Sequence, residues 1–234
     1  MTSFESVPYR KLLHSPPFAV KIALCIPVSA NEGGASASVY VHSSNPLPYI
    51  TMQQLSQVFT RGNLAGDYSS WPQLAQVEAT DAGSIHPLRL PNIAPLNLFL
   101  NQYHFDQRQP GWNGEYTGNT DELINKLATT PAAIGIAEAG RENPHIRAVP
   151  ISDGNGNLFG ANLKDMQNGH YPLTRYLHLY LPKNQHGLIS IPSLEFAEFV
   201  LSPAGQEIIS SHHRYAALSD EMVNVQSNLM AQSS

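Results

Sequence analysis

The sequence has little positive charge for its length. Its 234 residues include 13 Lys and Arg against 18 Asp and Glu, which gives a formal net charge of −5. A protein that binds nucleic acid needs a broad basic surface facing the phosphates, so this composition argues against nucleic acid as a partner. A buried site for one small anion needs only a few donors, and the net charge does not exclude such a site.

The chain also has one cysteine and no long apolar run. Cys25 cannot form an internal disulfide, and the apolar residues around it predict a small buried side chain in a strand rather than a catalytic thiol. No apolar segment approaches the roughly 20 residues of a membrane-spanning helix. Met1 is not followed by the basic and apolar regions of a signal peptide, so the chain as written is expected to carry no export signal.

Recognised catalytic and metal-binding signatures are absent too. There is no Gly-x-Ser-x-Gly elbow, P-loop or dinucleotide fingerprint, and the acidic residues Asp67, Asp81, Glu115 and Glu122 form no close carboxylate pair. The ten histidines show no pair at metal-ligand spacing with a nearby carboxylate. We therefore predict no catalytic residue, no bound metal and no cofactor. Serine and histidine are plentiful, so a dispersed catalytic triad stays open.

The C-terminal third, by contrast, is strongly patterned. Tyr171–Pro182 alternates with a period of two, which is the pattern of a strand, and we expect this strand to be central in its sheet. Apolar residues at helical spacing follow in Leu194–Leu201. Ser202 and Pro203 then have the residue types of an N-cap and first helical residue. The predicted order is strand, helix, capped helix.

Upstream, local signals predict alternating strands and helices. Thr51 and Gln54 have the spacing of a capping box, and Asn119 with Glu122 marks the start of a second helix. The Gly- and Asn-rich segment Asp153–Asn157 predicts a surface loop or hairpin. The remaining expectations are strands at Phe18–Ile26, Ser38–His42 and Pro131–Ala137, a strand and helix start within Ile85–Leu100, a short helix before Pro16, and a turn at Asn31–Gly34.

Three blocks of this sequence resemble the phosphate ABC-transporter substrate-binding proteins. They are VYVHSSNPLPYITMQQLSQVFT followed by WPQL, the helix and apolar strand from Asn119 to Ala137, and YPLTRYLHLYLPK followed by EFAEFVLSPAGQEII. That family has the type II periplasmic-binding-protein fold, with two α/β lobes around an anion cleft. The resemblance therefore implies an α/β protein whose mixed sheets are flanked by helices.

The resemblance also implies a domain organisation. It runs from Phe4 to Leu218 but begins inside the family's first lobe, which implies an N-terminally truncated or divergent member with an incomplete first lobe. Residues 1–44 and 131–234 would form this discontinuous lobe, and residues 45–130 the inserted second lobe. Val39–His42 and Ala132–Ala137 would cross between the lobes. The incomplete lobe would expose apolar sheet surface and favour self-association.

The anion ligands implied by the resemblance fall in Ile85–Leu100. In the family, an arginine followed shortly by Ser-Gly-Thr at a helix start holds the anion. Arg89 stands close to the position of that arginine, and Asn92 and Asn97 could donate at the helix start. Two other interpretations stay open: Arg89 could pair with a surface carboxylate, and Asn92 could be only a cap or turn residue.

The Ser-Gly-Thr itself is replaced here by Ala94-Pro95-Leu96. The replacement removes two hydroxyls, and Pro95 also lacks a backbone N–H donor. A hydrogen bond to a charged group contributes ~1.5–3 kcal/mol, so several lost bonds would weaken anion binding by orders of magnitude.

The resemblance implies a non-enzymatic solute-binding protein in the periplasm or at the cell surface. It would bind phosphate or a related oxyanion in a cleft between two lobes and deliver it to an ABC-transporter permease. The alternative is a degenerate relative that has kept the fold and lost the ligand, acting as an interaction or regulatory module, or a truncated product. Nothing in the sequence argues for a third class, an enzyme with dispersed catalytic residues.

Overall fold

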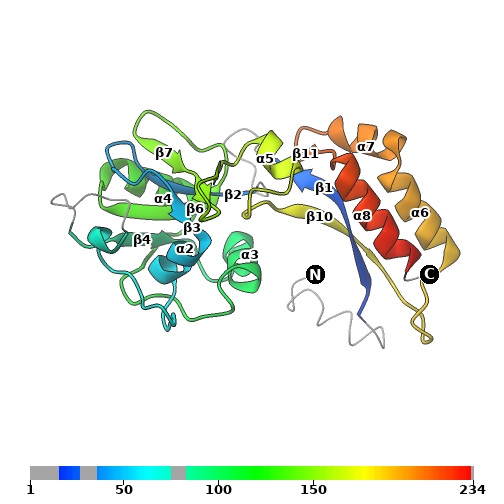
Figure 1. The fold of residues 1–234 in the computed structure, drawn as a ribbon, viewed down its shortest axis with the longest axis horizontal. Helices are drawn as coiled ribbons and strands as arrows, with labels where there is room; N and C mark the ends of the chain where they lie inside the picture. Colours follow the sequence, from blue (N-terminus) through cyan, green and yellow to red (C-terminus); the bar gives the residue numbers. More distant parts are fainter. Residues whose placement is uncertain (1–15, 27–35, 75–82, 233–234) are drawn as a thin grey trace. The chain divides into compact units, whose positions relative to one another are not determined.

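The computed structural model describes residues 16–26, 36–74 and 83–232. The helix predicted before Pro16 and the turn predicted at Asn31–Gly34 lie outside these ranges. The chain divides into two compact units (Figure 1). Unit 1 combines Met1–Val28 with Thr174–Ser234, and unit 2 is the continuous segment Ser29–Leu173.

Unit 2 is built on a five-stranded mixed sheet. Its described strands, in spatial order, are β5 (Glu115–Tyr116), β4 (His86–Arg89), β6 (Ala133–Glu138), β2 (Ala37–His42) and β7 (Ile146–Val149). β4 runs parallel to β5 and β6, whereas β2 runs antiparallel to β6 and β7. β2 and β6 are buried along nearly their whole length, because both faces of the sheet centre are covered.

Three helices of unit 2 carry the features predicted from sequence. They are α2 (Met52–Phe59), α3 (Pro95–Tyr103) and α4 (Thr120–Thr129). The capping box of Thr51 and Gln54 at α2 and the Asn119 cap at α4 are both confirmed. α4 packs closely on β6 because Gly135 leaves room for it: a Cβ at Gly135 would lie 2.8 Å from the Leu123 side chain.

A smaller sheet in unit 2 joins β3 (Ile50–Thr51), β8 (Ile151–Ser152) and β9 (Leu158–Phe159). β8 and β9 form the hairpin predicted at Asp153–Asn157, where Gly154 and Gly156 have φ of 81° and 98°. Side chains other than glycine rarely adopt this backbone region, so the Gly-Asn-Gly order suits the turn. The 3₁₀ turn η1 (Trp71–Gln73) and helix α5 (Leu163–Gln167) complete the unit's described elements.

In the part of unit 1 that the structure describes there are a three-stranded sheet and three helices. The described strands lie in the order β10 (Tyr176–Leu181), β1 (Phe18–Cys25) and β11 (Tyr215–Ala216), and helices α6 (Ile191–Leu201), α7 (Pro203–Ser210) and α8 (Asp220–Ala231) pack against β1 (Figure 1). The predicted Ser202 cap of α7 is confirmed, since its side chain accepts a hydrogen bond from the Gly205 N–H.

The prediction that the Tyr171–Pro182 strand is central is wrong for the described sheet. β10 is an edge strand there, and β1 takes the middle position because it pairs with β10 along its length and with β11 at Leu24 and Cys25. Only Leu181 of β10 is fully buried, which agrees with an edge position. Alternation in the sequence predicts a strand but not how many neighbours it has.

The predicted lobes, residues 1–44 with 131–234 and residues 45–130, stay a prediction. The division into compact units falls after residues 28 and 173. Val39–His42 and Ala132–Ala137, which were predicted to cross between lobes, contribute β2 and β6, and these strands are hydrogen-bonded neighbours inside unit 2, with Val39 opposite Ile136. The α/β class with mixed sheets flanked by helices is confirmed. Among the described residues, no helix combines the length and apolarity needed to cross a membrane.

Candidate functional site

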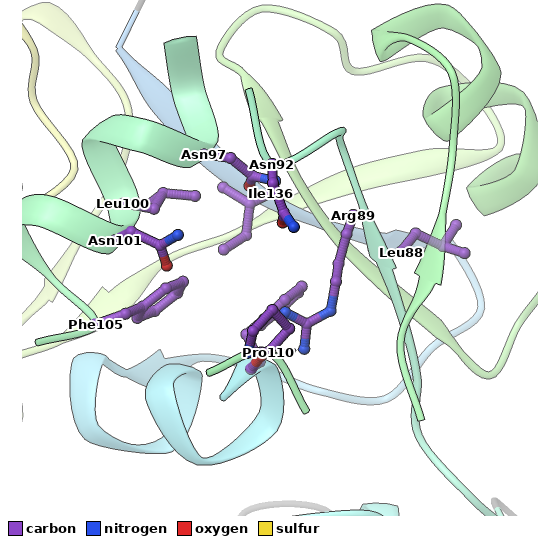
Figure 2. A pocket seen from close by; sticks show the side chains of 10 residues that line it. Leu88, Arg89, Asn92, Asn97, Leu100, Asn101, Phe105, Pro110 and Ile136 are labelled. Atoms are coloured by element: carbon purple, nitrogen blue, oxygen red, sulfur yellow. Dashed lines mark hydrogen bonds between the residues drawn. The ribbon is translucent and has the colours of Figure 1, made fainter. Parts of the chain in front are cut away.

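The three predicted anion ligands, Arg89, Asn92 and Asn97, lie around one small pocket of unit 2, which we call the Arg89 pocket (Figure 2). They come from the end of β4, the turn after it and the first turns of α3. The other lining residues are Phe59, Leu88, Leu100, Asn101, Phe105, Pro110 and Ile136. The pocket volume is about 20 Å³, which is room for about one water molecule.

Arg89 is the most constrained side chain of the pocket. It is only 8% exposed; its Nη2 donates to the Phe59 carbonyl, and its guanidinium lies 5.4 Å from the Phe59 ring centroid. Its Nε is buried and has no hydrogen-bond partner. Burial lowers the pKa of Arg89 to about 10, so the side chain still carries its charge at neutral pH. The ion pairs found among the described residues do not include Arg89, so the surface-carboxylate interpretation gains no support.

Two glycines make room for the Arg89 side chain. A Cβ at Gly114 would lie 2.2 Å from Nε, and a Cβ at Gly111 would lie 3.2 Å from Nη2. Neither glycine has a positive φ, so the requirement here is for space rather than for a left-handed backbone. The guanidinium therefore depends on glycine backbone passing beside it, a constraint that the sequence alone did not reveal.

The two predicted asparagines differ in what they can offer an anion. Asn97 Nδ2 donates to the carbonyls of Leu90 and Pro91, at 2.5 and 3.2 Å, so both of its donors already hold the turn before α3. Asn92 Oδ1 accepts from the Tyr116 hydroxyl at 3.1 Å, which leaves the amide donors of Asn92 unused. Asn92 is thus the better placed of the two to donate to an anion.

The start of α3 lacks side-chain oxygens, as its sequence indicated. Its N-cap is Ala94, which makes no side-chain cap, and Pro95 occupies the first turn. The pocket instead extends along the helix face that carries Asn97, Leu100 and Asn101. Figure 2 shows the Asn101 amide directed toward the space between α3 and Arg89. Sequence reasoning missed Asn101, although its i+4 spacing from Asn97 places both on one helix face.

The described residues give little support for metal binding or for catalysis by a cysteine. They contain no group of three or more His, Cys, Asp or Glu side chains that could hold a metal ion. Cys25 lies at the end of β1, half-buried rather than fully buried as expected, and burial raises the pKa of its thiol. A raised pKa keeps a thiol protonated, which is unfavourable for a nucleophile.

Sequence comparison finds relatives among phosphate-binding proteins. No protein-family model matches the chain. Two curated proteins named phosphate-binding protein PstS, both from Pseudomonas aeruginosa, are 24% identical to it over 182 residues, which cover 74% of this chain and 54% of theirs. The chain therefore spans about half the length of the curated relatives it matches.

Structural comparison finds the same fold in solved phosphate-binding proteins. A possible phosphate-binding protein from Planctomyces limnophilus has a TM-score of 0.62 at 16% identity, covering 99% of this chain and 78% of that one. An ABC-type phosphate transport receptor from Vibrio cholerae and PstS from Borrelia burgdorferi have TM-scores of 0.61 and 0.62, each at 12% identity and covering 86% of this chain and 72% of theirs.

These findings show that the chain has the α/β fold of the phosphate-binding proteins to which it is similar. The predicted resemblance to the phosphate ABC-transporter substrate-binding proteins is confirmed in sequence and in fold. The names of these relatives describe phosphate binding and phosphate transport, in agreement with the prediction of a non-enzymatic protein.

Proposed function

We propose that this chain is a ligand-binding part of a phosphate-type ABC-transporter solute-binding protein, and that it binds phosphate or a related oxyanion beside Arg89. The curated relatives support the transport role. Within the chain, the observation that carries the ligand is the buried, charged Arg89 with an unpaired Nε. Delivery to a permease, a periplasmic or cell-surface location and a cleft shared by two lobes belong to the same proposal.

The ligand needs more space than the Arg89 pocket now offers. A volume of about 20 Å³ holds about one water molecule, whereas a tetrahedral oxyanion brings four oxygens. The turn that carries Asn92 is the lining segment best able to yield, because Asn92 is exposed and is held by a single side-chain bond to Tyr116. We expect ligand binding to displace this turn and to leave the buried Arg89 side chain near its present place.

A second candidate is the degenerate relative that no longer binds an anion. It is favoured by Ala94-Pro95-Leu96 at the helix start and by the two Asn97 donors already engaged with Leu90 and Pro91. Two missing hydroxyl bonds to a charged ligand, at ~1.5–3 kcal/mol each, correspond to about two to four orders of magnitude in affinity. Such a chain would act through protein partners instead.

Isothermal titration of the full chain with phosphate and with sulfate separates these candidates. We expect binding to the unaltered chain and at least a tenfold loss in Arg89→Lys, because lysine keeps the charge but cannot reproduce the guanidinium geometry. Arg147→Lys is a matched control, since Arg147 is a partly buried arginine of the same unit that donates to the Asn45 and Leu47 carbonyls. If the folded chain bound neither anion, the proposed anion binding would be wrong and the degenerate relative would be the remaining candidate.

A further inference from the structure

Unit 2 has a second, much larger pocket, which we call the hairpin pocket. Its volume is about 400 Å³, against about 20 Å³ for the Arg89 pocket, and lies within the roughly 300–1,000 Å³ typical of small-molecule sites. Its lining comes from three segments: the start of α2 (Thr51, Met52, Gln53), the β8–β9 hairpin (Ile151, Ser152, Asp153, Gly154, Phe159) and the segment with His170 and Pro172. None of these residues lines the Arg89 pocket.

One part of the hairpin pocket is apolar and partly aromatic. Met52, Ile151, Phe159 and Pro172 contribute hydrocarbon or ring surface. The rings of Phe159 and His170 lie 5.0 Å apart between centroids, with an angle of 36° between their planes. Phe159 is half-buried, whereas His170 is exposed at the edge. Such surfaces favour contact with a flat organic ring.

The charged group of the hairpin pocket is Asp153. Its Oδ1 accepts from the backbone N–H groups of Asn155 and Asn157, at 2.8 and 3.2 Å, and its Oδ2 accepts from Asn157 Nδ2 at 2.8 Å. These bonds, the one from the Asn157 side chain first, lower the pKa of the Asp153 carboxyl, so it is ionised at neutral pH. A carboxylate has about four acceptor positions, so one position of Asp153 stays open to a ligand.

The lining carries no lysine or arginine to balance this carboxylate. The start of α2 would ordinarily favour an anion, but the reciprocal hydrogen bonds of Thr51 and Gln54 already engage the N–H groups of these two residues. The Ser152 hydroxyl likewise already accepts from the Gly154 N–H. The Asp153 carboxylate, with no lysine or arginine beside it in the lining, therefore makes the pocket more favourable for a cation.

We propose that the hairpin pocket binds a small flat organic cation, such as an aromatic amidine, with its charge on Asp153 and its ring against Phe159 and His170. A charge-assisted bond to the carboxylate would fix the cationic end. Contact of the ligand's ring and charge with the Phe159 and His170 rings would contribute further binding free energy. The pocket is separate from the Arg89 pocket, so this proposal does not depend on anion binding there.

Benzamidine and the neutral benzamide test the proposal, because the two molecules have nearly the same shape and differ in charge. Binding to the full chain is measured by titration, with the site located by amide chemical shifts. We expect benzamidine to bind at least tenfold more tightly than benzamide and to shift the amide signals of Gly154 and Asn155 rather than those of Gly111 and Gly114. Equal binding of the two, or binding of neither, overturns the proposal.

Asp153→Asn removes the charge and keeps an oxygen for the turn bonds, so the hairpin should stay folded. We expect it to weaken benzamidine at least fivefold and to leave benzamide unchanged. Asp106→Asn, at an exposed carboxylate outside the hairpin pocket, is the matched control and should alter neither. If phosphate displaced benzamidine, and still did so in Arg89→Lys, the hairpin pocket would be an anion site and the proposal would be wrong.

Discussion

The central strands of unit 2 are buried more fully than the edge strand β10 and the α6 region of unit 1. In unit 2, β2 and β6 each have five of six residues buried. In unit 1, β10 has one buried residue of six, and the region around α6 leaves large apolar side chains exposed. These are Leu188, Ile191, Phe196, Phe199 and Ile208, with exposed fractions between 49% and 71%. We call these five residues the α6 patch.

The difference in burial between the two units agrees with the location of the pockets. Both pockets described above lie in unit 2, where a covered sheet supports the side chains that line them. Helix α6 carries apolar residues on all sides, and a helix of that kind is usually buried on all sides. Unit 1 therefore exposes apolar surface of the kind that a protein partner usually buries. This agrees with the predicted self-association, which stays a prediction.

The largest expected effect concerns the α6 patch. If it mediates self-association, the full chain will form a dimer or larger species in light scattering coupled to size-exclusion chromatography. Phe196→Glu with Phe199→Glu should then yield a monomer, because two charges would have to be buried at the contact. Leu64→Glu, at a fully exposed position of unit 2, should leave the mass unchanged. A stable monomer before any substitution would contradict the prediction.

The next effect compares one glycine in each unit. Gly205→Ala in unit 1 would place a Cβ 2.2 Å from the Phe199 carbonyl oxygen and 2.6 Å from that of Val200, and backbone cannot move aside easily. We expect a loss of about 3 kcal/mol in the free energy of unfolding, measured by denaturant titration. Gly114→Ala in unit 2 would place a Cβ 2.2 Å from Nε of the buried Arg89 side chain, which has somewhat more freedom than backbone, so about 2 kcal/mol is expected.

Two further readouts sharpen this glycine comparison. Gly114→Ala should weaken anion binding, because it displaces the Arg89 guanidinium, whereas Gly205→Ala should not. Gly83→Ala is the control for both, since a Cβ there meets nothing within 4 Å. Equal losses of stability at Gly114 and Gly205 would show that Arg89 is held as firmly as backbone.

The smallest effect is a pH dependence inside unit 2. His104 Nε2 is buried without a partner, the ring contacts Phe99 at 5.0 Å, and burial lowers the pKa of His104. The unfolded chain then binds a proton that the folded chain resists, so stability should fall as pH drops below about 6.5, the pKa of an unperturbed histidine. His104→Gln should flatten the unfolding free energy between pH 7 and 5. The exposed His213→Gln should not, and an unchanged profile in His104→Gln would refute the assignment.

Local signals in the sequence predicted local structure well. The capping box of Thr51, the caps Asn119 and Ser202, and the hairpin at Asp153–Asn157 all form as expected. Each depends on residues within five positions of one another, so the sequence contains the whole interaction. The family resemblance then supplied the α/β class and led to Arg89.

Features that depend on distant residues were beyond the sequence. The edge position of β10 follows from the pairing of β1 with β11, nearly 200 residues apart in the chain. The engagement of Asn97 with Leu90 and Pro91 depends on how the turn closes, and the hairpin pocket on three separated segments. Residue type alone made Asn97 a candidate donor, and only coordinates show that its donors are taken.

The Phe59 carbonyl connects the Arg89 side chain to the end of α2 and to the backbone at Gly111. This oxygen at the end of α2 accepts from Arg89 Nη2 and also from the Gly111 N–H, so both of its lone pairs are engaged. Any anion that drew the guanidinium toward itself would have to share or break the first bond, while the bond from the Gly111 N–H would remain. Ligand binding would then change the hydrogen bonding of the last turn of α2, although the ligand would not contact the backbone of that helix.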